Sequence, residues 1–207
     1  MSKERQLRKQ EEVRNTILDA ARDIIAKDGI RGLSIRKITN AIDYSPAIIY
    51  HYFKDKNEIV ETLVREGYER ILASIGSVKR NENEPEKEIR EAFTRYIAAA
   101  LESPEYYRAV MLNDDPAVLK RTRLLEKGIS ERSQTLQMLC SSIQRGVNQG
   151  RFTPCDIELT AQILWTSTFG LIIKLMVEKD ISRDQVNRLI DHQFTVLFNG
   201  IMSRNEV

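Results

Sequence analysis

Apolar residues recur every three or four positions along almost the whole chain, and no stretch shows the sustained alternation of apolar and polar residues typical of a β-strand. The pattern is clearest near the N-terminus, where Val13, Ile17, Ala21 and Ile24 share one face of a helix expected over about residues 9–27. Only 9 glycines and 5 prolines interrupt such patterns in 207 residues. The periodicity therefore predicts an all-α protein.

Capping signals divide the chain into further helices. Ser34 and Ser45 each precede an apolar segment, as an N-cap residue does, and Pro46 takes the first helical position, where its missing N–H is harmless. The acidic, polar stretch 81–88 predicts a linker. The further helices are expected at about 35–42, 46–53, 55–77, 86–101, 104–112, 116–149, 154–178 and 183–202.

The two short helices at 35–42 and 46–53 are joined by a tight turn and follow a longer helix, which is the order of elements in a helix-turn-helix. In that motif the second helix lies in the major groove of duplex DNA, with its N-terminal residues at the base edges. The second helix here begins with the small residues Ser45, Pro46 and Ala47 and continues with the polar Tyr50 and His51. Lys54 and Lys56 follow at its exit, where they can meet the backbone of the duplex. Without DNA, the same residues would be an ordinary solvated surface.

The segment 29–64 resembles the signature of the TetR family of transcriptional regulators. It contains Gly-x-x-Gly-Leu-Ser, Ile-Arg-x-Ile, Ser-x-x-x-Ile-Tyr-x-Tyr-Phe and Lys-Asp-Lys in that order, and residues 14–22 resemble the first helix of the family. The resemblance implies a three-helix helix-turn-helix DNA-binding domain at 1–56 and a helical ligand-binding and dimerisation domain at 57–207. It also implies a cytoplasmic homodimer that binds palindromic double-stranded operator DNA, most often as a repressor, and is released by a small-molecule inducer.

The resemblance also assigns roles to single residues. Ser34 would bind a phosphate, and Arg36 would read a base edge, for which guanine suits its two-pronged donors. Tyr50 and Lys56 would hold phosphates and set the register. The residues that would face bases are Ser45, Pro46, Ala47 and His51. Ile48 departs from the family, which often carries Thr or Ser there, and an apolar contact to a thymine methyl is one consequence.

The last two helices carry apolar stripes that predict a dimer interface. Two faces of the helix at 154–178 are apolar, so that one face can pack on the protomer while the other meets a second copy. The candidate interface residues are Leu164, Leu171, Leu175, Leu189, Phe194 and Leu197. The alternative is that both stripes belong to the core of one protomer.

Large, adaptable side chains in the middle helices are candidates for lining a ligand chamber: Phe93, Tyr96, Tyr107, Met111, Met138, Trp165 and Phe169. Such residues also fill ordinary cores, so the chamber depends mainly on the family resemblance. The hydroxyls of Thr166, Ser167 and Thr168 need partners inside an apolar helix, and either a ligand or the carbonyls of their own helix can supply them.

Composition and charge narrow the remaining choices. Residues 1–56 hold 12 Lys and Arg against 8 Asp and Glu, a net charge of +4, whereas the remainder is at −2. The polar N-terminus predicts no signal peptide, and Cys140 and Cys155 predict neither a disulfide nor a metal site. The chain contains no phosphate-binding loop, dinucleotide fingerprint, zinc motif or nucleophile elbow, so no enzyme, cofactor or metal is expected. A helical protein–protein adaptor stays the alternative function.

Overall fold

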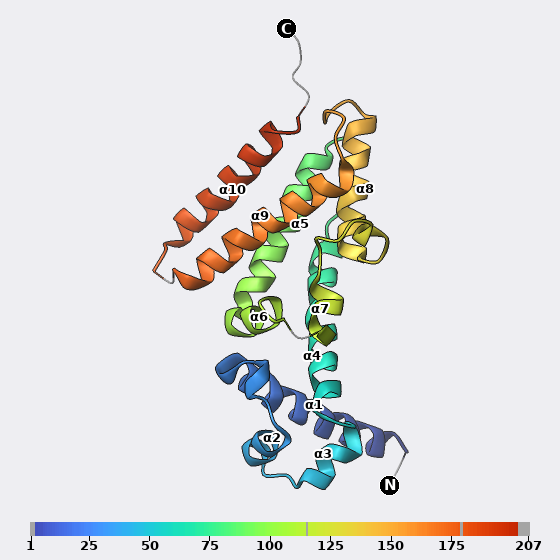
Figure 1. Ribbon diagram of the computed structural model, residues 1–207, viewed down its shortest axis with the longest axis vertical. Coiled ribbons are helices and arrows are strands. Elements are labelled where there is room, and N and C mark those ends of the chain that lie inside the picture. The colour runs from blue at the N-terminus through green and yellow to red at the C-terminus, as the bar shows by residue number, and fades with distance from the viewer. Residues whose placement is uncertain (1–2, 115, 179, 203–207) are drawn as a thin grey trace. The chain divides into compact units, whose positions relative to one another are not determined.

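The computed structural model describes residues 3–114, 116–178 and 180–202 (Figure 1). Over these residues the secondary structure is helical, with a single isolated bridge between Phe152 and Met202 in place of any strand. The chain divides into two compact units, one made of Met1–Glu69 with Ser103–Thr122 and the other of Arg70–Glu102 with Arg123–Val207. The all-α prediction is confirmed, whereas the division between the units differs from the expected boundary at residue 56.

The first unit contains the N-terminal helices and two that come much later in the chain. Ser34 and Ser45 begin their helices as expected, and Pro46 is at the first position of its helix. The elements of the unit are α1 (Lys3–Asp28), η1 (Ile30–Gly32), α2 (Ile35–Ile42), α3 (Pro46–Tyr52), the part of α4 (Lys56–Gly76) up to Glu69, α6 (Pro104–Met111) and α7 (Pro116–Thr122).

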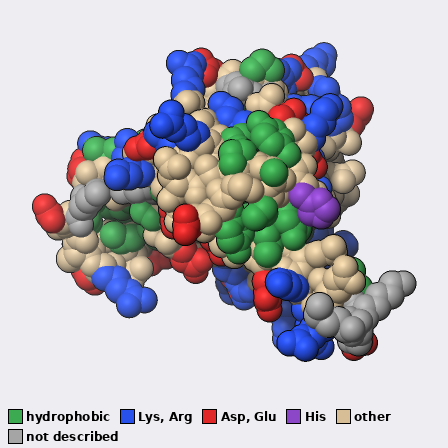
Figure 2. All heavy atoms as spheres, turned by 90° about the horizontal axis from the view of Figure 1, so that it is seen from below, with side chains coloured by type: hydrophobic (Ala, Val, Ile, Leu, Met, Phe, Trp, Pro, Cys, Tyr) green, Lys and Arg blue, Asp and Glu red, His purple; other side chains and the backbone are tan. Residues whose placement is uncertain are grey.

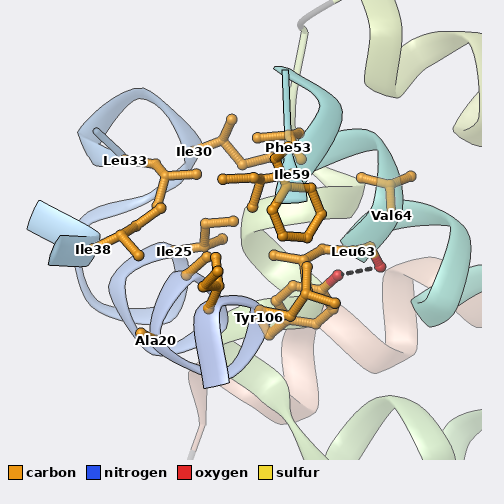
Figure 3. Packing of buried hydrophobic residues seen from close by; sticks show 14 of the residues in the cluster. Ala20, Ile25, Ile30, Leu33, Ile38, Phe53, Ile59, Leu63, Val64 and Tyr106 are labelled. Atoms are coloured by element: carbon orange, nitrogen blue, oxygen red, sulfur yellow. Dashed lines mark hydrogen bonds between the residues drawn. The ribbon is translucent and has the colours of Figure 1, made fainter. Parts of the chain in front are cut away.

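The core of the first unit joins these distant segments (Figure 3). Ile38 of α2, Ile49 of α3 and Ile59 of α4 have no exposed surface. Each such side chain contributes roughly 1.5–3 kcal/mol by leaving water. Tyr106 of α6 enters the same core, and its hydroxyl donates a hydrogen bond to the carbonyl oxygen of Leu63 at 2.6 Å. The packing of α6 and α7 explains why this unit is discontinuous in the sequence.

The second unit has an aromatic core between its long helices. Trp165 lies with its ring centroid 4.9 Å from that of Tyr96 and 5.7 Å from that of Phe93, which in turn is 5.6 Å from Phe194. The helices are the end of α4, α5 (Pro85–Glu102), η2 (Ile129–Glu131), α8 (Gln134–Asn148), α9 (Ile157–Val177) and α10 (Arg183–Asn199). The α9 helix is long and apolar enough to cross a membrane by length and composition, but its side chains Leu164, Trp165, Ile172, Leu175 and Met176 are buried in the core of this unit.

The expectation of one helix over 116–149 is wrong, because the chain leaves the helix at Thr122 and enters α8 only at Gln134. Polar side chains of α9 bind the intervening loop. Glu158 accepts hydrogen bonds from the backbone N–H groups of Gly128 and Ser130 and from the Ser130 hydroxyl, and Gln162 donates to the carbonyls of Leu124 and Glu126. Gly128 has φ +77°, which ends regular helix.

The first half of the stretch 81–88, expected as a linker, is outside any helix, and α5 begins at Pro85. Asn81 accepts hydrogen bonds from the backbone N–H groups of Asn83 and Glu84, which closes a short turn before the helix. Glu86 and Glu88 then pair with Arg151 and Arg145. The acidic residues that indicated a linker therefore stabilise the second unit.

Candidate functional site

The turn between α2 and α3 is set by local hydrogen bonds. Ser34 Oγ accepts a hydrogen bond from the Lys37 backbone N–H at 3.2 Å, which caps the start of α2. Asp43 ends the helix in the left-handed conformation with φ 54°, and its N–H bonds to the carbonyl of Thr39. The chain reverses within three residues, so α3 begins immediately at Pro46.

The α3 helix buries one face and exposes the other. Ile49 and Phe53 are 0% and 2% exposed in the core. Tyr50 is 56% exposed on the opposite face, and His51 is exposed beside it. The sequence-predicted DNA contacts reach solvent on α2, α3 and the following turn: Arg36, Ser45, Pro46, Ala47, Tyr50, His51 and Lys54 are exposed, and Ser34 and Lys56 are half-buried.

Apolar side chains form part of this exposed face. Ala47, Ile48 and His51 of α3 line a shallow groove together with Val13 and Lys9 of α1. Figure 2 shows hydrophobic side chains gathered beside a histidine on the face seen from below, with Lys and Arg side chains around them. Ile48, 37% exposed, is the departure from the family pattern noted in the sequence.

Ion pairs hold the helices that carry this face. Lys37 Nζ lies 2.6 Å from Asp28 Oδ2, and this hydrogen bond lowers the pKa of Asp28. The Arg22 guanidinium of α1 pairs with two carboxylates. Its Nη1 lies 2.5 Å from Asp19 Oδ1 on the same helix, and its Nη2 lies 3.3 Å from Glu66 Oε2 on α4. Within the described residues Arg36 has no such ion pair, which leaves its guanidinium available to a ligand.

The start of α4 is fixed by a reciprocal cap, as the spacing Asp55-x-x-Glu58 suggests. Asp55 Oδ1 accepts a hydrogen bond from the Glu58 N–H at 3.0 Å, and Glu58 Oε2 accepts one from the Lys54 N–H at 2.6 Å. The backbone at Lys54 is therefore tied to the first turn of α4, which begins at Lys56.

The second unit contains a cavity of about 60 Å³ between the end of α4, α5, α8 and α9. Three sequence-predicted ligand residues line it, namely Phe93, Met138 and Trp165. Tyr96 is buried against Trp165, and Phe169 is half-buried on α9. Tyr107 and Met111 lie on α6 in the first unit, where Tyr107 is buried and Met111 packs against the core.

The sequence reasoning missed the polar lining of this cavity. Glu88, Thr135 and Ser142 line it together with apolar residues. Of the two kinds of partner expected for the α9 hydroxyls, Thr166 and Thr168 use the carbonyls of their own helix, those of Gln162 and Leu164. Glu88 and Arg145 have opposite charges and lie on two amphipathic helices. A possible ion pair between such residues is the weak signal in the sequence that could have predicted a polar group at this site.

The predicted dimer residues differ in their exposure. Leu164, Leu175 and Phe194 are 2%, 8% and 0% exposed, so their side chains pack mainly inside the protomer. Leu171, Leu189 and Leu197 are half-buried. The exposed apolar side chains of these two helices are instead Leu159, Ile163 and Val177 of α9 and Val196 of α10, each exposed by more than half.

Comparison with known proteins identifies the family. Residues 87–197, more than half of the chain, match the family described as "Tetracyclin repressor-like, C-terminal domain". Residues 17–63 match "Bacterial regulatory proteins, tetR family". The chain belongs to the TetR family.

Individual TetR-family proteins resemble the chain over most of its length. The transcriptional regulator UidR of Escherichia coli K12 is 21% identical over 176 residues, 83% of this chain and 85% of UidR. The transcriptional repressor KstR2 of Mycobacterium tuberculosis H37Rv is 23% identical over 159 residues, 75% of this chain and 78% of KstR2. A solved structure of a TetR-family regulator from Marinobacter aquaeolei shares the fold with TM-score 0.69 at 18% identity, over 97% of this chain and all of that one.

Membership of the TetR family makes the protein a transcriptional regulator with an N-terminal helix-turn-helix and a helical C-terminal domain. The N-terminal match contains α2 and α3, and therefore the exposed face built above. Over the part of the chain that the structure describes, no group of three or more His, Cys, Asp or Glu could hold a metal ion.

Proposed function

We propose that the protein is a repressor that binds a palindromic operator as a homodimer through α2 and α3 and is released by a small molecule. One observation carries the proposal that the protein binds DNA: the α3 helix has two distinct faces. It buries Ile49 on one face and exposes Tyr50 and His51 on the other. Arg36, exposed on α2 and without an ion pair among the described residues, supplies a donor for a base edge. The protein acts in the cytoplasm, where its operator is, and without a catalytic step.

Dimerisation follows from the nature of the site. A single short recognition helix reads few base pairs, and a two-fold dimer doubles both the contacts and the length of the sequence read. Exposed apolar residues on α9 and α10, Leu159, Ile163, Val177 and Val196, offer the surface that a second copy would cover. The half-buried Leu171, Leu189 and Leu197 extend that surface.

Release by a small molecule requires a ligand to favour one arrangement of the dimer over another. The α4 helix is continuous, with Ile59 in the core of the first unit and Ile75 at the cavity of the second. Movement of α4 would change the distance between two recognition helices, which must match the ~34 Å repeat of DNA. A solved relative is the ketosteroid transcriptional regulator KstR2 of Mycobacterium tuberculosis, and its name agrees with an apolar ligand here.

The test is selection of binding sites from random duplex DNA by the purified protein, followed by titration at two salt concentrations. We expect a palindrome whose two half-sites are about one helical turn apart, bound with an affinity that falls steeply as salt rises. An exposed arginine of the second unit, Arg80, provides a matched control, because Arg80→Ala should leave the affinity unchanged. A folded, ligand-free sample that enriches no sequence would overturn the proposal and favour a protein–protein adaptor.

A further inference from the structure

A tryptophan at the cavity of the second unit carries a hydrogen-bond donor that no group accepts. Trp165 is 5% exposed, and its Nε1 has no partner among the described residues. A buried donor without a partner destabilises the free protein, because the N–H group has lost its hydrogen bond to water and gained none. An acceptor brought by a ligand would restore that bond, so the residue favours occupancy of the cavity.

Most of the lining is apolar. Ile75, Ile89, Ala92, Phe93, Met138 and Leu139 surround the space with hydrocarbon and one aromatic ring. A ligand that fills it is therefore held mainly by the hydrophobic effect.

Charge in the lining is already balanced. Glu88 is the one charged residue among the described residues that line the cavity. Its carboxylate accepts hydrogen bonds from the Ser142 hydroxyl at 2.7 Å, the Asn81 backbone N–H at 2.7 Å and the Arg145 guanidinium at 2.5 Å. Burial alone would raise the pKa of Glu88, but these donors outweigh it and lower the pKa, so the group stays ionised. Among the described residues the lining thus offers no cation to an anionic ligand, and its one carboxylate is already bound to three donors.

The present volume of about 60 Å³ is below the roughly 300–1,000 Å³ of pockets that enclose drug-sized ligands. A ligand larger than a few atoms must therefore displace a side chain. Met138 is 37% exposed and unbranched, so it can turn outward at little cost. This displacement gives the occupied and empty forms different structures, as regulation requires.

We propose that the cavity binds a neutral, mostly apolar ligand whose carbonyl oxygen accepts a hydrogen bond from Trp165 Nε1. The inference rests on the proposed function, since it names the chemical class of the small molecule. A carbonyl provides a strong acceptor and brings no donor of its own, which suits a lining whose carboxylate is already occupied.

Four probes that share a cyclohexane ring test the chemistry: cyclohexyl methyl ketone, ethylcyclohexane, cyclohexanecarboxylate and cyclohexylmethylamine. The chain contains 1 tryptophan, so the ¹⁵N-labelled protein gives a single indole N–H resonance. We expect the ketone to shift this resonance downfield in a saturable way, as a new hydrogen bond does. The hydrocarbon should bind without that shift, and the two charged probes should bind more weakly than the ketone. Because this experiment uses the unaltered chain, it does not depend on the folding of a variant.

Trp165→Phe then removes the donor and keeps an aromatic ring. The affinity of the ketone relative to the hydrocarbon should fall about tenfold in this variant, the size of one hydrogen bond. Phe152→Leu changes an aromatic side chain of the same unit that stacks on Phe198 and does not line the cavity, so the ratio should be unchanged. An equal ratio in the wild type and Trp165→Phe, or tighter binding of either charged probe, would overturn the inference.

Titration of the selected operator duplex with the same sample separates this inference from the proposed function. If the protein binds DNA but none of the probes, the inferred ligand class is overturned and the proposed role as a DNA-binding regulator is kept. Saturable binding of the ketone without binding of duplex DNA would support the ligand class and overturn the proposed function.

Discussion

Each of the two units buries an aromatic side chain that carries a polar atom, and the hydrogen bonding of that atom differs between them. In the first unit Tyr106 is 7% exposed, and its hydroxyl bonds to the Leu63 carbonyl at 2.6 Å. In the second unit Trp165 is 5% exposed and its N–H has no partner among the described residues. The polar atom of the buried Tyr106 is thus satisfied, whereas the N–H of Trp165, beside the cavity, is not. The difference places an unmet aromatic donor where a ligand can supply its acceptor.

The largest expected effect is on the stability of the first unit. Ile49→Ala removes a side chain with no exposed surface from between α2, α3 and α4, and should lower the free energy of unfolding by about 2–5 kcal/mol. Ile48→Ala at the neighbouring, partly exposed position should change it by less than about 0.5 kcal/mol. Urea unfolding followed by circular dichroism measures both. Equal losses would contradict the described orientation of α3.

The next largest effect is expected from the half-buried ion pair of the second unit, between Glu88 and Arg145. Glu88→Gln removes the charge that faces Arg145, and should cost about 1.5–3 kcal/mol of unfolding free energy at neutral pH. Glu91→Gln on the same helix, which removes an exposed pair with Arg95, should cost about 0.3–0.5 kcal/mol. Urea unfolding measured by the emission of Trp165, the single tryptophan, checks both.

The pH dependence has a definite sign. The folded pKa of Glu88 lies below its ordinary value of 4.5, so the stabilisation is present above that value and is lost as pH falls through the folded pKa. Hydrogen bonds from Ser130 and Gly128 lower the pKa of Glu158 in the same unit. The difference between wild type and Glu88→Gln should therefore narrow as the solution is acidified below about pH 4. A constant difference would show that the charge of Glu88 does not stabilise the fold.

A third prediction concerns the exposed face of the first unit. Arg36→Ala should weaken binding to the selected operator by about 1–3 kcal/mol and relax the preference at one position of each half-site. Lys37→Ala, next in the chain but paired with Asp28, should affect affinity less and leave the preference intact. Competition between operator variants distinguishes the two results. An unchanged preference in Arg36→Ala would remove this residue from base recognition.

The smallest expected effect concerns Ile48. If its side chain meets a thymine methyl, replacing that thymine by uracil should cost about 0.8 kcal/mol, the contribution of one buried carbon. Ile48→Ser should abolish this difference in affinity between thymine and uracil, while the base preferences at the other operator positions are unchanged. If every thymine in the operator can be replaced without loss, Ile48 makes no such contact.

The helix-turn-helix could be predicted because its signals are local. Ser34, Asp43 and Ser45 act on their own neighbours in the chain, and the structure begins and ends α2 and α3 at or within one residue of the expected positions. The break between α7 and α8 could not be predicted in this way. It depends on Glu158 and Gln162, which bind the loop from about 30 residues or more along the chain.

Two other differences have the same origin in long-range packing. The return of α6 and α7 to the first unit depends on Tyr106 and Val118, whose apolar character is equally suited to either unit. The α9 helix is apolar around most of its circumference, so periodicity alone does not tell that Leu164 is buried and Ile163 exposed. Trp165, Phe93 and Met138 could be predicted at the cavity because large apolar side chains are typical of ligand pockets. Glu88 and Ser142 also line it, but their residue types gave no such indication.

The discontinuity of the first unit has a consequence for its synthesis. A ribosome releases the chain from its N-terminus, so α1 to α3 emerge long before Tyr106, Val110 and Val118, which complete their core. Until then the core of α1 to α4 lacks these side chains, and the Leu63 carbonyl of α4 lacks the hydrogen bond from Tyr106. The DNA-reading unit therefore reaches its final form only when more than half of the protein has been translated.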